Sequence, residues 1–210
     1  MSLFLNSIMS LVRSEKIRSL LDNPRMFNFI RGTLDGSQNE IREYMQQILH
    51  LTEDDYVLDM CCGTGDYANV VPGRYLGIDI NQRFIKFAQG RYINDNRKQF
   101  VVCDAESTGL PDKSFKYSFF ISALHHFSEP FNLLILKEIS RLTQSKIVVV
   151  DLVPCQKYFL KHFLTKLDRG DYVRTIEEQR KLINRVLKID KEEVFICRLA
   201  VFAVYICDAG

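Results

Sequence analysis

The sequence predicts an α/β fold, a doubly wound sheet in which most strands are parallel. Short apolar segments alternate with amphipathic helical patterns, and an acidic residue follows several of the apolar segments, where a parallel strand would end. The 210 residues are 47% hydrophobic and 26% charged, which suits one such domain with a sizeable core. The predicted strands are 55–60, 74–79, 100–103, 116–121, 146–151 and a closing antiparallel hairpin of 194–199 and 201–207. The predicted helices between them are 38–50, 66–71, 81–91, 130–142 and 175–187.

Composition and charge exclude several classes of protein. The formal net charge is only +2, so nucleic acid is not an expected partner. No apolar run reaches the length of a membrane-spanning helix, and the N-terminus lacks the features of a secretory signal. The six cysteines include no C-x-x-C pair, and several lie in predicted buried strands. Taken together with the family resemblance given below, they indicate reduced core thiols in a cytoplasmic protein. No residue pattern indicates a metal site.

Residues 1–50 are expected to form a helical cap. Apolar residues recur at roughly helical spacing over 1–22, and Asn23-Pro24 should end that helix. Gly32, Asp35 and Gly36 predict a bend before the helix over 38–50. The first helix could pack as a cap over the domain, close over a substrate or touch a membrane surface. Arg31 could reach a substrate carboxylate, or it could be a surface cation.

The stretch 56–66, YVLDMCCGTGD, joins a predicted buried strand to a tight glycine turn. Asp59 stands where the strand runs out, and the small residues Cys61, Gly63 and Gly65 form the turn. Such a turn lets the backbone come close to a ligand, and the N–H groups of a helix starting near 66 suit polar or negative groups. This stretch therefore predicts the floor of a nucleotide-type cofactor site.

Two cofactor classes fit a strand, a glycine turn and a helix. A dinucleotide fits because Gly63-x-Gly65-x-x-Ala68 matches the G-x-G-x-x-G/A fingerprint. S-adenosylmethionine (SAM) fits because a carboxylate at Asp59 would repel a pyrophosphate but can meet the cationic amino group of a methionine moiety. The carboxylate therefore favours SAM.

Residues 58–66 resemble motif I of the class I SAM-dependent methyltransferases, in which Cys61 stands where that family more often has glycine. The Leu-Pro-x-x-x-Phe segment at 110–115 is also similar to this family, and residues 122–127 correspond to its motif IV. The likeness covers roughly residues 30–155 and is closest to small-molecule methyltransferases of type 11, such as those of ubiquinone and menaquinone biosynthesis. The resemblance implies a Rossmann-like seven-stranded sheet, SAM as cofactor with S-adenosylhomocysteine (SAH) as product, and a small-molecule methyl acceptor.

Acidic residues also follow the second and third predicted strands. Asp79 lies about 20 residues past the glycine-turn strand, the spacing at which an acidic residue meets ribose hydroxyls, and Ile80 stands beside it. A lone Asp at a strand end can instead cap the next helix. The resemblance assigns Asp104 to the adenine amino group and the backbone of Ala105 to a ring nitrogen. The alternative for Asp104 is a turn-forming role.

The loop after the fourth predicted strand borders the reacting methyl group in the family that the sequence resembles. Ser122 is expected to contact the cofactor. His126 could deprotonate a hydroxyl or an amine as a general base, and His125 could line the substrate pocket. Alternatively, one of the two histidines caps or packs against the following helix, and the other is a neutral hydrogen-bonding group. The loop lacks the Asn/Asp-Pro-Pro-Tyr/Phe pattern that grips a nucleic-acid base, which argues against methylation of DNA amino groups.

The C-terminal part contains weaker candidates. Asp151 ends the fifth predicted strand, where it could orient a substrate, act as a base or serve as a solvated cap. Tyr172 and Arg174 stand in a charged stretch where a substrate loop would lie. Thr175-x-x-Glu178 is a capping-box pattern. Cys155 is expected to be structural.

We interpret residues 1–210 as a single SAM-dependent methyltransferase domain, with a cap or lid over 1–50, a cofactor-binding core over 51–155, and helices with a closing hairpin over 156–210. The expected activity is in-line methyl transfer to a small molecule, in which binding and alignment dominate and a base is needed only for a protonated acceptor. Peripheral membrane contact could occur through the first helix, and the oligomeric state stays open. The alternatives are a non-catalytic protein with this fold and an NAD(P)-dependent oxidoreductase, which predicts a parallel sixth strand instead of the hairpin.

Overall fold

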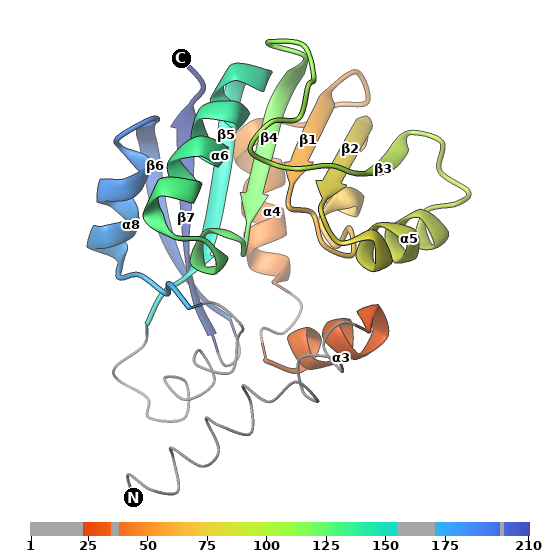
Figure 1. Ribbon diagram of the computed structural model, residues 1–210, viewed down its shortest axis with the longest axis horizontal. Coiled ribbons are helices and arrows are strands. Elements are labelled where there is room, and N and C mark those ends of the chain that lie inside the picture. The colour runs from red at the N-terminus through yellow and green to blue at the C-terminus, as the bar shows by residue number, and fades with distance from the viewer. Residues whose placement is uncertain (1–22, 35–37, 155–170, 198–199) are drawn as a thin grey trace, which may run out of the picture.

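The computed structural model describes residues 23–34, 38–154, 171–197 and 200–210, and within these the side chains of residues 30, 31, 33 and 34 are not described. In this part of the chain, seven strands form one sheet in the order β3-β2-β1-β4-β5-β7-β6 (Figure 1). Their bounds are β1 Tyr56–Met60, β2 Arg74–Asp79, β3 Lys98–Val102, β4 Phe115–Ile121, β5 Thr143–Leu152, β6 Lys188–Cys197 and β7 Ala200–Asp208.

Strands β1 to β5 pair with one another in parallel, as the sequence predicts. The segment 147–150 of β5 is fully buried because helices cover both faces of the sheet. β7 runs antiparallel to β5, with Val204 opposite Val150, and β6 runs antiparallel to β7. The structure therefore confirms a mostly parallel, Rossmann-like sheet that closes with an antiparallel hairpin.

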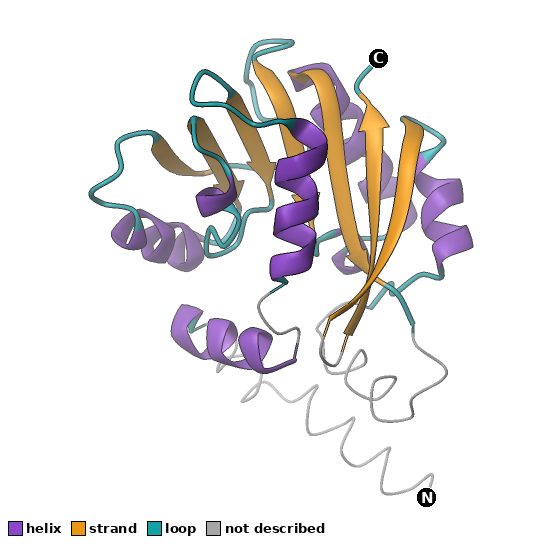
Figure 2. Cartoon of the chain, turned by 180° about the vertical axis from the view of Figure 1, so that it is seen from behind, coloured by secondary structure: helices purple, strands orange, loops and turns teal. Residues whose placement is uncertain are grey.

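Buried apolar residues form a core on each face of the sheet. Helices α4 (Asn39–Leu49) and α5 (Gln82–Arg91) contribute to one core, and α6 (Glu129–Leu142) and α8 (Ile176–Ile183) contribute to the other. Figure 1 shows α6 and α8 over one face, and Figure 2 shows α4 against the opposite face. Helix α8 begins with the predicted capping box, in which Thr175 and Glu178 each accept the other's backbone N–H.

The Asn23-Pro24 pair begins a helix, α3 (Pro24–Leu34), and Gly32 lies inside it, so the predicted bend does not begin there. Asn23 Oδ1 accepts from Arg25 N at 3.0 Å, and a proline is tolerated in the first turn, so the pair suits a helix start. Helix α3 lies beyond the carboxyl ends of the parallel strands (Figure 1). The predicted helix over 1–22 and Cys155 fall outside the described residues. None of the helices described here has the length and apolar character needed to cross a membrane.

The predicted helix after the glycine turn is reduced to a single 3-10 turn, η1 (Ala68–Val70). Residues 61–67 form the turn itself, and Pro72-Gly73 ends the segment after four more residues. The residues between them are too few for an α-helix. The argument from the N-terminus of a helix therefore does not apply to this site. Of the two arguments for a ligand site at the glycine turn, only the close approach of the turn backbone to a ligand remains.

Strand β6 begins at Lys188, earlier than the predicted 194. Its first half, 188–193, is mostly charged, and the strand lies at the edge of the sheet. An edge strand exposes much of its length to water, so it carries no continuous apolar signal in the sequence. Only the apolar half of β6, from residue 194 on, has a sequence pattern that predicts a strand.

Candidate functional site

A cavity of about 410 Å³ lies at the carboxyl ends of β1, β2 and β4, a volume within the range of small-molecule sites. Its walls come from the glycine turn, from the loops after β2, β3 and β4, and from α3, α5 and α6. The lining residues are Phe27, Asp59, Cys61, Cys62, Gly63, Asp66, Tyr67, Asp79, Ile80, Asn81, Phe84, Cys103, Asp104, Ala105, Glu106, Ile121, Ser122, Ala123, His126, Phe127, Phe131 and Ile135.

Asp59 on β1 is a buried carboxylate of this cavity, with an exposed fraction of 2%. Tyr75 on the adjacent β2 donates its hydroxyl proton to Asp59 Oδ2 at 2.5 Å. Burial, followed by the charge of Asp59, raises the pKa of Tyr75 well above its usual value, so this hydroxyl stays a donor. The hydrogen bond therefore fixes the orientation of the carboxylate at the cavity wall.

The glycine turn contains a cysteine in a glycine-like conformation. Cys61 has φ +61°, a left-handed region that costs a non-glycine residue about 1–2 kcal/mol. This strain explains why glycine is the more frequent residue at this position in the resembling family. Gly65 has φ +74°, and a Cβ there would lie 2.6 Å from Phe100 Cε1. Gly65 is not among the residues that line the cavity, so it serves the packing beneath the turn.

Asp79 at the end of β2 links the glycine turn to helix α5. Its Oδ2 accepts from Gly63 N at 2.9 Å, and its Oδ1 accepts from Asn81 N at 2.8 Å. Burial raises the pKa of Asp79, and the two N–H groups oppose that rise. Each carboxylate oxygen keeps a further lone pair for a ligand. Ile80, beside it, is 74% exposed and also lines the cavity.

Asp104 and Ala105 follow β3 and line the cavity together. Asp104 is exposed, and its Oδ1 accepts from Glu106 N at 3.0 Å, so the side chain shapes the turn. Behind this loop, Glu138 of α6 accepts from both the backbone N–H and the hydroxyl of Thr108. The pKa of Glu138 is lowered to about 2, chiefly by its hydrogen bond from Arg141. This carboxylate therefore stays charged and anchors the loop.

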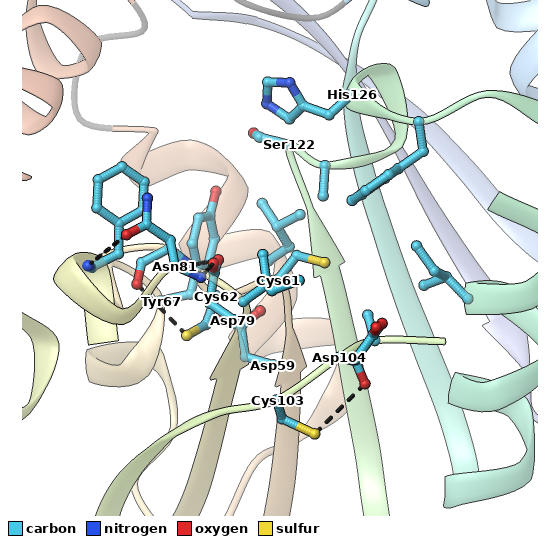
Figure 3. Close-up of a pocket in the computed structure, with 18 of the residues that line it drawn as sticks. Asp59, Cys61, Cys62, Tyr67, Asp79, Asn81, Cys103, Asp104, Ser122 and His126 are labelled. Atoms are coloured by element: carbon cyan, nitrogen blue, oxygen red, sulfur yellow. Dashed lines mark hydrogen bonds between the residues drawn. The ribbon is translucent and has the colours of Figure 1, made fainter. Parts of the chain in front are cut away.

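The loop after β4 contributes Ser122 and His126. Ser122 has φ +51°, and its buried hydroxyl oxygen makes no hydrogen bond to any residue that the structure describes. His126 is exposed and lines the cavity. In the view of Figure 3, these two side chains lie at one end of the cavity, and Asp59, Asp79 and Asp104 lie farther along it.

The structure places His125 and Asp151 away from the cavity lining. Both side chains are fully buried, and His125 Nδ1 lies 2.5 Å from Asp151 Oδ1. The sequence predicts that Asp151 ends its strand, but β5 continues to Leu152, and Asp151 pairs with Ala203 of β7 inside the sheet. Complete burial also excludes the solvated cap for Asp151.

Tyr172 and Arg174 do not line the cavity either. The Arg174 guanidinium donates to the carbonyl oxygens of Leu124 and Phe127, at 3.1 and 3.0 Å, and so connects the C-terminal segment to the loop after β4. Arg31 lies on α3, and its side chain is outside what the structure describes.

Sequence reasoning missed the aromatic walls of the cavity. Phe27 of α3 contacts Phe84 of α5 with ring centroids 5.0 Å apart, and Phe127 stacks on Phe131 of α6 at 6.1 Å. Phe84 lies on the buried face of α5, and no sequence pattern distinguishes a cavity wall from core packing. Thr64 of the glycine turn hydrogen-bonds Asn28 of α3 at 2.7 Å, and this contact places Phe27 over the cavity.

Acidic side chains dominate the electrostatics of the cavity. Five carboxylates line it, and the described lining includes no lysine or arginine; the acidic residues are Asp59, Asp66, Asp79, Asp104 and Glu106. Burial and then these charges raise the pKa of Cys61 well above its usual value, so it is a neutral thiol in the wall. Such a site attracts a cationic ligand and repels a phosphate.

Comparison with known proteins gives a consistent family. A model described as a methyltransferase domain matches residues 57–146. An uncharacterized protein of Methanocaldococcus jannaschii is 28% identical over 155 residues, 73% of this chain and 57% of that protein. A demethylmenaquinone methyltransferase of Lactobacillus johnsonii is 33% identical over 89 residues, 38% of this chain and 36% of that enzyme. The chain therefore spans 57% of the length of the first of these curated relatives and 36% of the length of the second.

Solved structures share the fold. The PH0226 protein from Pyrococcus horikoshii has a TM-score of 0.67 at 17% identity, over 94% of this chain and 92% of that one. A geranyl diphosphate C-methyltransferase from Streptomyces coelicolor, solved with SAH, has a TM-score of 0.66 at 12% identity, over 82% and 76% of the two chains. The matched domain contains the glycine turn and the strands that carry the cavity, and the fold agrees around it. Residues 57–146 therefore match a methyltransferase domain, and the chain has the fold of solved SAM-dependent methyltransferases.

Proposed function

We propose that this chain is an enzyme that transfers a methyl group from SAM to a small-molecule acceptor. The observation that carries the proposal is the convergence of Asp59, Asp79 and Asp104, from the ends of three neighbouring strands, on one cavity. SAM carries a sulfonium and an ammonium group, so an acidic cavity attracts it. The volume and the mixed acidic and aromatic walls suit a nucleoside with a charged amino-acid tail.

Each part of SAM has a chemically matched group in the cavity. Asp59 would accept from the ammonium group, and Asp79 would accept from the two ribose hydroxyls. Asp104 would accept from the adenine amino group, beside the backbone of Ala105. The remaining contacts with the cofactor would come from the turn and from neighbouring walls, at Cys61, Gly63, Ile80 and Ser122. Gly65 would act indirectly, by letting the turn pack on Phe100.

The chemistry asked of the protein is mainly alignment. Bound SAM supplies a methyl group that its sulfonium has already activated. The residues of the chain then need to hold the acceptor in line and exclude water, and the aromatic walls around Phe27 and Phe127 suit both tasks. His126 lies at the cavity with an exposed imidazole, where it would take a proton from an acceptor hydroxyl or amine. Asp151 would not act as this base, because it is fully buried and bonded to His125.

Topology and charge both argue against an NAD(P)-dependent oxidoreductase. That alternative predicts a parallel sixth strand, whereas the sixth position of this sheet holds the antiparallel β7. A dinucleotide would also bring its pyrophosphate against the acidic walls. Small organic acceptors are supported by the names of similar proteins, which include methyltransferases of demethylmenaquinone and of geranyl diphosphate.

Isothermal titration calorimetry tests the proposal directly. We expect SAM and SAH to bind the wild-type chain with one-to-one stoichiometry and NADH to give no binding heat. The proposal is lost if folded protein shows no binding of SAM at about millimolar concentration. Transfer of a labelled methyl group across a panel of phenols, quinols and amines then separates an enzyme from a non-catalytic relative, which would bind SAM without turnover.

A further inference from the structure

The turn that presents His126 to the cavity is held by side chains from two other elements. It is the 3-10 turn η2 (Leu124–His126) after β4. Asn132 Nδ2 of α6 donates to the carbonyl oxygens of Leu124 and Phe127, both at 2.9 Å. The Arg174 guanidinium donates to the same two oxygens. Both ends of the turn are therefore fixed, and the fork of the guanidinium holds the distance between them.

The middle of the turn is anchored from below. The backbone carbonyl of His125 accepts from Tyr172 N at 3.0 Å. The His125 ring is fully buried, and its Nδ1 lies 2.5 Å from Asp151 Oδ1. Asp151 is itself locked in the ladder between β5 and β7. A buried charge in a rigid strand thus sets the orientation of the His125 ring.

The guanidinium of Arg174 and the carboxylate of Asp151 interact electrostatically within this group. Burial lowers the pKa of Arg174, and the charge of Asp151 opposes that fall.

His126 lies directly against this group. Its ring stands 4.1 Å from the His125 ring, centroid to centroid, with the planes tilted by 45°. Unlike His125, it is exposed and lines the cavity near Ser122 (Figure 3). The backbone on both sides of His126 and the ring beneath it are therefore constrained, while its imidazole faces the ligand space. This is the arrangement expected of a side chain that must be pre-organised for contact with a ligand.

We propose that His125, Asp151 and Arg174 are positioning residues that fix the turn Leu124–His126, so that His126 presents its imidazole to the methyl-accepting group. The role of His126 toward an acceptor rests on the proposed function. The positioning itself concerns the free protein and can be measured without an acceptor.

Ring signals of the four histidines provide the test. The protein is labelled with ¹³C at histidine Cε1, and the His126 signal is assigned with a His126→Gln variant. We expect one sharp His126 signal in the wild type. Asp151→Asn should shift and broaden it, because the charge-assisted bond to His125 is lost. Arg174→Lys should do the same, because a lysine cannot span the two carbonyl oxygens.

Asp171→Asn is the matched control, since it removes a carboxylate from an exposed residue of the same segment. We expect it to leave the His126 signal unchanged. Both positioning variants should keep the wild-type affinity for SAH within about twofold, because neither residue lines the cavity.

Two results would overturn the inference. In the first, the His126 signal of both variants superposes on that of the wild type. In the second, the variants no longer bind SAH, and their histidine signals all lose their dispersion. The second result would show that these residues hold the whole domain rather than the turn. Failure of SAH to bind the wild-type chain would instead remove the proposed function, and the histidine signals would still report on the turn.

Discussion

Acidic residues follow parallel strands in two regions of this sheet, and the two regions use them differently. At the ends of β1, β2 and β3, the carboxylates of Asp59, Asp79 and Asp104 line a cavity. Near the end of β5, Asp151 is fully buried and bonded to His125. The same pattern, an aspartate after an apolar run, therefore gives cavity-lining groups in one region and a fully buried group in the other.

The difference lies in what pairs with each strand. β2 ends at Asp79 and β3 ends at Val102, before Asp104, so these chains turn outward where the acidic residues stand. β5 gains an antiparallel partner, β7, which extends the ladder past Asp151 to Leu152. Beyond Asp79 and Asp104 no neighbouring strand continues the ladder. Asp59 lies inside its ladder, as Asp151 does, but it stands beside the glycine turn, where the cavity opens.

The largest expected effect is on stability in the β5 region. Asp151→Ala removes the carboxylate that is bonded to the fully buried His125, and breaking a buried pair in this way costs about 3–5 kcal/mol. Urea unfolding followed by circular dichroism measures the loss. Asp104→Ala, on the exposed side of the comparison, should cost about 1 kcal/mol or less, since it removes one turn hydrogen bond. Equal losses in the two variants would erase the distinction between the regions.

The next effect is on ligand affinity in the cavity region. Asp79→Ala should weaken SAM binding by about 1–3 kcal/mol, because the acceptors for the ribose hydroxyls are lost. Calorimetry with SAM measures this, and a melting curve checks that the variant is folded despite losing its bonds to Gly63 and Asn81. Asp171→Ala provides an exposed control that should bind as the wild type does. An Asp79→Ala protein with unchanged affinity would refute the ribose role.

The smallest effect sharpens the comparison within the glycine turn. Cys61→Gly relieves a left-handed non-glycine conformation, and the gain is partly offset by the entropy of glycine in the unfolded chain. We expect a net stabilisation of about 0.5 kcal/mol in urea unfolding. Cys103→Gly is the matched control: Cys103 is not among the positive-φ residues, so this variant should lose about 1 kcal/mol. Destabilisation of both variants alike would contradict the strain at Cys61.

Local signals predicted the glycine turn and several of the residues that line the cavity. The segment 56–66 folds as a strand and a tight turn because glycine permits positive φ at Gly63 and Gly65, while Cys61 adopts positive φ at an energetic cost. The spacing from this turn to Asp79 placed two acidic groups at one cavity. The predicted helix near Asp66 was wrong because Pro72-Gly73 stops the chain after one 3-10 turn.

The sequence by itself determined the order of strands and helices and the acidic residues at the glycine-turn end, since periodicity and turn chemistry act over short stretches of chain. The tertiary structure alone decided which polar groups face the ligand space. His125 and His126 are neighbours in sequence, yet one is buried against Asp151 and the other lines the cavity. Contacts from α6, β7 and Arg174, distant along the chain, made that choice, because burial depends on what packs against a residue rather than on the residue beside it.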